Sequence, residues 1–208
     1  LDGTLVNTSH YHFLAWSKIL SEIGGSITEQ NVLLNEGRSA KEILQVLLKE
    51  TGVNLPTEEF KNIIERKRDY YQRIAKVELY PGVVELLSKL KSEGFLLSVV
   101  TSCAKKTMIN SLNEENQSLF HYIQTGDDIQ NSKPNSEPYE IAIKKLCLIP
   151  EECIAVENAP LGIESAKRAG LECIAVESTL NREFLSEADC IVSDIRDILV
   201  STYFKDNY

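Results

Sequence analysis

From Tyr80 onward, the chain alternates short apolar runs with helical stretches in which apolar residues recur every three or four positions. The first helical stripe ends at Gly94, and the buried run FLLSVVTS follows it. The alternation then continues as a strand HYIQTGDD, a helix PYEIAIKKLCL, a strand ECIAVEN, a helix LGIESAKRAG and a strand ECIAVES. This order is typical of a parallel sheet with crossover helices, so the pattern predicts an α/β fold with a Rossmann-like core.

Residues 9–77 differ, because they carry helical periodicity with little sign of a strand. One helix is expected to begin after Ser39, where SAKE matches a capping box with Glu42, and another is expected from Thr57 to about Lys76. The sequence therefore predicts a core made of residues 1–8 and 78–208, with an inserted helical cap at residues 9–77 over the strand ends.

The composition fits an ordinary globular protein, with 43% hydrophobic and 25% charged residues among 208. No segment approaches the roughly 18 continuous apolar residues of a membrane span. The net charge of -9 argues against binding to nucleic acid, since phosphate backbones require clustered Lys and Arg. The five cysteines form no CxxC pair, which favours a reduced, cytoplasmic protein whose cysteines are small buried side chains.

Polar residues follow the predicted strands, at the edge where ligands bind in an open α/β sheet. Each of them has a simpler interpretation as a turn residue, a solvated loop charge or a helix cap. Several such turns at one edge nevertheless favour convergence on a site for phosphoryl transfer with Mg²⁺. These residues are Asp2, Thr101, Ser102, Asp127, Asp128, Lys133, Glu157 and Asn158.

The same stretches resemble the haloacid dehalogenase-like (HAD) phosphatase superfamily over nearly the whole chain. LDGT is similar to the end of the DxDGT motif, and VVTS to the hydroxyl motif. SKPNSEPY is similar to the lysine motif, and VENAPLGIESAKRAG to the acidic metal motif and its helix. The helical insert and YHFLAW resemble the β-phosphoglucomutase-like subfamily, which has a small helical cap.

The resemblance implies a role for each matching residue. Asp2 would be the general acid and base, and its backbone carbonyl would bind Mg²⁺ with Glu157 and Asn158. Asn158 stands where many relatives have Asp, so its amide oxygen can still bind a cation but one negative charge is lost. Asp2, Lys133 and Thr101 would form the catalytic set. The expected phosphate-binding residues are Gly3, Thr4, Thr101, Ser102 and Lys133.

Three residues of the insert are candidates for substrate binding. His12 matches a histidine near the acid/base aspartate, with packing on a helix face beside Trp16 as the alternative. Lys67 matches a substrate-contacting lysine, although its charged surroundings, ERKRDYY, favour an exposed helix face. Arg38 could grip a distal phosphate, but mutases of this subfamily usually carry an arginine at the position of Ala40.

These features favour a phosphatase that acts through an aspartyl-phosphate on small phosphorylated metabolites such as sugar phosphates. A β-phosphoglucomutase-type hexose-phosphate mutase is the close alternative, because only the cap decides whether water or a sugar hydroxyl accepts the phosphoryl group. A dehalogenase is less favoured. A monomer or weak oligomer is expected.

A non-catalytic phosphometabolite-binding protein is a third interpretation, because the resemblance places the nucleophilic aspartate two residues before Asp2. That position precedes Leu1, so the sequence as written is expected to lack the nucleophile and to be inactive. The first strand, which would carry it, is accordingly expected to be truncated.

Overall fold

The computed structural model describes residues 1–201 and contains parallel strands in two sheets, which confirms the predicted α/β class. One sheet pairs β1 with β2, and the other has the order β3-β4-β5. The two copies of ECIAVE occupy the neighbouring strands β3 and β4, where Ala155 lies opposite Cys173. The alternation pattern did not anticipate β5. The strands are β1 (Ser98–Val100), β2 (Tyr122–Gln124), β3 (Ile154–Glu157), β4 (Glu172–Val176) and β5 (Cys190–Val192).

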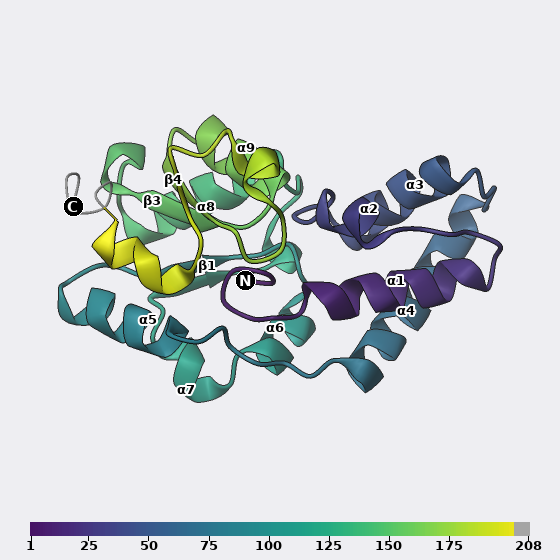
Figure 1. Ribbon diagram of the computed structural model, residues 1–208, viewed down its shortest axis with the longest axis horizontal. Helices are drawn as coiled ribbons and strands as arrows, with labels where there is room; N and C mark the ends of the chain where they lie inside the picture. Colours follow the sequence, from purple (N-terminus) through teal and green to yellow (C-terminus); the bar gives the residue numbers. More distant parts are fainter. Residues whose placement is uncertain (202–208) are drawn as a thin grey trace.

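Helices occupy the predicted stretches between the strands and most of the insert (Figure 1). Ser39 and Glu42 form the expected capping box at the start of α3. The helix expected from Thr57 is a 3₁₀ turn that leads into α4. The α-helices are α1 (Ser9–Ser21), α2 (Glu29–Leu33), α3 (Ala40–Thr51), α4 (Phe60–Ile74), α5 (Val83–Ser92), α6 (Lys105–Ser111), α7 (Glu114–Gln117), α8 (Glu137–Leu146) and α9 (Pro160–Arg168).

Helices cover both faces of the β3-β4-β5 sheet because successive strand residues point to opposite sides. On one face Ala155 and Cys173 pack with α8 and α9. On the other face Ile174 and Val176 pack with α5 and the 3₁₀ segment Ile195–Val200. The result is a three-layer arrangement in which the strand ends are the part left open for polar side chains.

The helices α1 to α4 lie together at one end of the molecule (Figure 1) and share a hydrophobic cluster of their own. It is built around Trp16, Leu20, Leu44 and Leu47, each at most 1% exposed. A separate cluster of this kind is what an inserted cap needs to hold its shape. The division into core and cap segments agrees with this packing and stays a prediction.

A largely apolar cavity of about 500 Å³ separates the two sheets. Val99 and Val100 of β1 line it from one side, and Ile154 and Val156 of β3 line it from the other. Leu1 also lines it, so the start of the chain borders this cavity. β1 and β3 are not hydrogen-bonded to each other, so the two sheets are separate.

The cysteines depart from the expected burial. Cys173 is buried, whereas Cys103, Cys153 and Cys190 are partly exposed and Cys147 is exposed. Cys147 ends α8 with a positive φ of 59°, a position at the surface where the helix terminates. All five are free thiols. Within residues 1–201, none of the helices has the length and apolar character needed to cross a bilayer.

Candidate active site

A pocket of about 170 Å³ lies between the insert and the carboxyl ends of the strands. Asp2, at the start of the chain, and residues from distant loops all face it, so the fold brings them together. The lining includes most of the candidates from the sequence: Asp2, His12, Arg38, Lys67, Thr101, Ser102, Lys133, Glu157 and Asn158.

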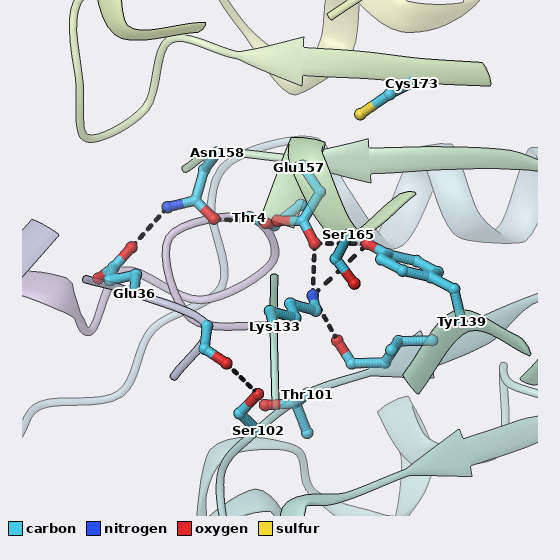
Figure 2. Close-up of polar contacts among 12 residues, drawn as sticks. Thr4, Glu36, Thr101, Ser102, Lys133, Tyr139, Glu157, Asn158, Ser165 and Cys173 are labelled. Atoms are coloured by element: carbon cyan, nitrogen blue, oxygen red, sulfur yellow. Dashed lines mark hydrogen bonds and ion pairs between the residues drawn. The ribbon is translucent and has the colours of Figure 1, made fainter. Parts of the chain in front are cut away.

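Lys133 and Glu157 form an ion pair at the bottom of the site, each at most 6% exposed (Figure 2). Tyr139 of α8 donates its hydroxyl to the same carboxylate oxygen, and its ring lies 4.8 Å from Lys133 Nζ. The loop that carries Lys133 is held by Glu137, which accepts hydrogen bonds from the amides of Gln130 and Asn131. Lys133 is therefore a buried, positioned cation and not a solvated loop charge.

Asn158 lies next to Glu157 but points in a different direction (Figure 2). Its Oδ1 accepts a hydrogen bond from Thr4 Oγ1 at 3.0 Å, and its Nδ2 donates to Glu36 Oε2 at 2.8 Å. A side chain at Gly3, which has a φ of 69°, would overlap the Asn158 amide. Asn158 does not cap α9, because Ala159 holds the N-cap position in extended conformation and the helix begins at Pro160.

Asp2 directs its carboxylate toward the insert. Its Oδ1 accepts a hydrogen bond from Thr8 at 2.6 Å and lies 3.4 Å from His12 Nε2. Lys67 Nζ lies 2.7 Å from His12 Nδ1, and the His12 ring stacks on Tyr71 at 4.2 Å. Lys67 is only 8% exposed, so the expected exposed helix face is wrong at this position. The chain of contacts fits a neutral His12 that accepts from Lys67 and donates to Asp2.

The protonation equilibria follow from burial and from these contacts. Burial and the charge of Lys67 lower the pKa of His12. Burial also lowers the pKa of Lys67, to about 8. The pKa of Asp2 lies below its usual range because contact with His12 outweighs the effect of burial. Burial raises the pKa of Glu157, but the charge and hydrogen bond of Lys133 have the larger effect and lower it. The site therefore favours ionised Asp2 and Glu157.

The hydroxyl candidates are engaged with neighbouring backbone. Ser102 Oγ donates to the carbonyl of Gly37 in the insert, and Thr101 Oγ1 accepts from the amide of Cys103 at 3.2 Å. The amides of Gly3 and Thr4 donate to carbonyls inside their own turn, those of Val6 and Leu1. A phosphoryl group would have to replace some of these contacts.

Asp127 and Asp128 do not line the pocket. Asp127 accepts from the amide of Lys105 at the start of α6, and Asp128 accepts from the amide of Thr125 in its own turn. Their expected convergence with the other strand-end residues is wrong, because each carboxylate instead accepts a hydrogen bond from a backbone amide outside the pocket, of Lys105 or of Thr125.

The motif comparison missed three residues of the site. Tyr139 fixes the Lys133–Glu157 pair, Arg68 lines the pocket beside Lys67, and Glu36 contacts Asn158. Burial, together with the charge of Asp2, raises the pKa of Glu36 to about 7. Tyr139 stands inside the recognised lysine motif, which was a usable signal. No pattern in the insert pointed to Glu36, because its role depends on how the loop between α2 and α3 folds onto the core.

The oxygen groups beside Asn158 fit a hard divalent cation. Residues 1–201 contain no cluster of three or more His, Cys, Asp or Glu side chains that could hold a metal, so any donor set would include other oxygen groups. The available donors are the carboxylate of Glu157, the amide oxygen of Asn158 and the backbone carbonyl of Asp2. Ser9 is buried and Glu36 is half-buried nearby, and the interaction of the Ser9 hydroxyl with the Glu36 carboxylate opposes the effect of burial on its pKa.

The family model that matches the chain is described as haloacid dehalogenase-like hydrolase, and it covers residues 1–176. The chain belongs to the haloacid dehalogenase-like hydrolase family. Its similarity to β-phosphoglucomutases in sequence and in structure places it in the β-phosphoglucomutase-like branch, as the motif resemblance predicted.

Two curated relatives of this HAD protein show the range of activities near it. A validoxylamine A 7'-phosphate phosphatase of Streptomyces hygroscopicus subsp. limoneus is 30% identical, over 95% of this chain and 92% of the relative. The β-phosphoglucomutase of Bacillus subtilis is 30% identical, over 85% of this chain and 80% of the relative. The crystal structure of a β-phosphoglucomutase from Clostridium difficile matches with a TM-score of 0.86 and 27% identity, over 100% of this chain and 94% of that one. A phosphatase and a sugar-phosphate mutase thus have the same percentage identity to this chain, over 95% and 85% of its length.

Proposed function

We propose that this chain performs Mg²⁺-dependent phosphoryl transfer through an aspartyl-phosphate, as a phosphatase of small phosphorylated metabolites such as sugar phosphates. The observation that supports this most is the pocket that gathers Asp2, Lys133, Glu157 and Asn158 beneath the insert. The curated relatives, which include phosphatases of phosphorylated carbohydrates, agree with the proposal.

Each residue has a part in the proposed reaction. Lys133 would neutralise charge on the phosphoryl group, and Thr101 and Ser102 would donate hydrogen bonds to its oxygens. Asp2, ionised and fixed by Thr8, would take the proton from the water that attacks the phosphorylated enzyme. A cation held by Glu157, Asn158 and the Asp2 carbonyl would shield the phosphoryl charge. The nucleophile would stand directly before Leu1.

The insert is proposed as the cap that selects the substrate, over residues 9–77. Arg38, Lys67 and Arg68 place cationic groups in the pocket, while Trp16 and Ile64 add apolar surface. A phosphorylated sugar offers both anionic and apolar faces, so this lining suits it. Arg38 donates through Nε to Asn35, which leaves its terminal nitrogens to meet an anionic group of the substrate.

A hexose-phosphate mutase is the second candidate, favoured by the contact of His12 with Asp2 and of Lys67 with His12. A fixed acid/base group is what transfer to a sugar hydroxyl requires, and the percentage identity to a β-phosphoglucomutase equals that to a phosphatase. Ala40 lines the pocket where mutases of the subfamily usually carry an arginine, which weighs toward the phosphatase. Product analysis with β-glucose 1-phosphate and catalytic bisphosphate separates the two, since a mutase yields glucose 6-phosphate and a phosphatase yields free phosphate.

The acid/base role of Asp2 can be tested in an extended variant, in which a hydrophobic strand ending in Asp is added before Leu1. Asp2→Asn in this variant should lower Mg²⁺-dependent hydrolysis of p-nitrophenyl phosphate by about 100-fold or more, because the general base is lost. Asp69→Asn, at an exposed position of α4, is the matched control and should keep its activity. Undiminished turnover in Asp2→Asn would remove Asp2 from the mechanism.

A further inference from the structure

Most of the cations that line the pocket already have partners within the protein. Lys133 is paired with Glu157, and Lys67 Nζ lies 2.7 Å from His12 Nδ1. Arg38 donates through Nε to an asparagine of its own loop at 3.0 Å. The contacts of these three side chains orient them and account for part of their hydrogen-bonding capacity.

Arg68 is a pocket cation of a different kind. It is half-buried in α4 and lines the pocket, yet it makes no hydrogen bond and no ion pair with any of residues 1–201. The carboxylates that line the same pocket contact other residues instead: Thr8 donates to Asp2, Asn158 to Glu36 and Lys133 to Glu157. Since a guanidinium carries five N–H donors, Arg68 has donors to offer to a ligand.

Lys67 places a second positive charge directly beside Arg68. Burial is the main cause that brings the pKa of Lys67 down to about 8, and the charge of Arg68 lowers it as well. Two like charges at one end of a pocket repel each other, and this repulsion is relieved when an anion binds there. The pocket therefore favours a ligand that brings negative charge to Arg68.

Arg68 belongs to the insert, whereas the proposed phosphoryl site belongs to the core. Ile64, one turn earlier in α4, lines the pocket together with Arg68, and Ala40 and Ile43 line it from α3. Lys133, which is proposed to neutralise the phosphoryl group, comes from a core loop on the same pocket. A small ligand with an anionic group at each end would therefore meet a cation from the core and another from the insert.

We infer that Arg68 is a specificity-determining residue, which binds a second anionic group, a carboxylate or a phosphate, at the far end of a small phosphomonoester. This inference rests on the phosphatase function proposed above and narrows its substrates to doubly anionic ones. Carboxylate and phosphate both present two oxygens to the planar fork of a guanidinium, which makes them its best ligands. A substrate that carries only hydroxyls at that end would leave the charge of Arg68 unpaired.

Titration calorimetry with matched pairs of ligands, on the chain Leu1–Tyr208 with Mg²⁺ present, tests the inference. Glycerol 3-phosphate and 3-phosphoglycerate differ by a carboxylate, and fructose 6-phosphate and fructose 1,6-bisphosphate differ by a second phosphate. The wild type should bind the doubly anionic member of at least one pair about 10-fold more tightly or better, as a charge-assisted hydrogen bond predicts. The pair that shows the preference identifies the second group.

Variants of α4 assign this preference to one side chain. Arg68→Gln should lose most of the preference and leave binding of the singly anionic ligands nearly unchanged. Arg68→Lys keeps the charge and should retain more of the preference than Arg68→Gln. Arg73→Gln is the matched control, because Arg73 is exposed on the same helix and does not line the pocket. It should behave as the wild type does, and circular dichroism checks that all variants fold.

Three results would overturn the inference and leave the proposed phosphoryl site standing. They are a wild type that prefers the doubly anionic ligand in neither pair, a preference that persists unchanged in Arg68→Gln, and a preference lost equally in Arg73→Gln. A wild type that binds none of the four ligands would instead overturn the proposed phosphoryl site, and this inference with it.

Discussion

At the scale of single residues, buried charged side chains determine the chemistry of the site. Lys67 and Lys133 are at most 8% exposed. Lys67 contacts His12 and Lys133 contacts Glu157, and these contacts offset part of the free-energy cost of burying a charge. Motif matching located Lys133 and Glu157 because they follow predicted strands. It did not establish the burial of Lys67, since a run of charged residues on a helix is usually solvated and only the docking of α4 against α1 encloses this one.

Lys67 should control the titration of His12. Lys67→Met removes a positive charge 2.7 Å from Nδ1, so the protonated ring becomes easier to form and the pKa of His12 should rise. Nuclear magnetic resonance titration of the ring in EDTA measures it. Lys61→Met, at an exposed position of the same helix, should leave the pKa unchanged. A pKa of His12 that stays constant or falls in Lys67→Met would contradict the contact.

Glu36 should make stability depend on pH in metal-free protein. Its folded pKa of about 7 lies above the ordinary glutamate value of 4.5, so between these values the folded state binds more protons than the unfolded state and stability falls as pH rises. Glu36→Gln lacks this loss. The free energy of unfolding of Glu36→Gln, relative to that of the wild type, should therefore increase by about 1 to 3 kcal/mol as the pH rises from 4.5 to 7. Above about pH 7 this difference should stay constant.

Urea unfolding in EDTA at several pH values measures this difference. Glu42 is the control of opposite sign, because hydrogen bonds from Ser132 and Ser39 outweigh burial and lower its pKa. The free energy of unfolding of the wild type, relative to that of Glu42→Gln, should hence increase as pH rises through the acidic range. A difference between wild type and Glu36→Gln that does not change with pH would show that Glu36 is not enclosed as described.

At the scale of elements, α9 is joined to the site by close packing at Gly162. A methyl group at this position would overlap the carboxylate of Glu157. Gly162→Ala should therefore destabilise the protein by about 1 to 3 kcal/mol through overpacking, although alanine normally favours a helix interior. Urea unfolding is the measurement. Arg168→Ala, at an exposed position on α9, should change stability by only about 0.5 kcal/mol. A stabilised Gly162→Ala would contradict the packing.

Periodicity and caps were sufficient to predict most elements. Ser39 and Glu42 marked the start of α3, and the ECIAVE repeats marked β3 and β4, because these signals are local. The strand β5 was missed, since CIV is a run of only three residues whose pairing with β4 depends on distant contacts. Glu36 was missed for the same reason: nothing near it in sequence shows that its loop meets Asn158.

At the scale of the whole molecule, cap, core and first loop meet at one pocket. Asp2 connects them, because its carboxylate contacts the insert while its turn packs against Asn158. The cavity beside Leu1 separates β1 from β3, directly behind this turn. The order of motifs predicted this convergence.

The most direct test of phosphoryl transfer places either Asp or Asn immediately before Leu1, at the end of the same added hydrophobic strand. Phosphate release from a panel of sugar phosphates is measured with and without Mg²⁺. The account predicts Mg²⁺-dependent release with Asp and none above background with Asn, because only the carboxylate can form the aspartyl-phosphate. Equal release by the two variants, or no release by either, would contradict it.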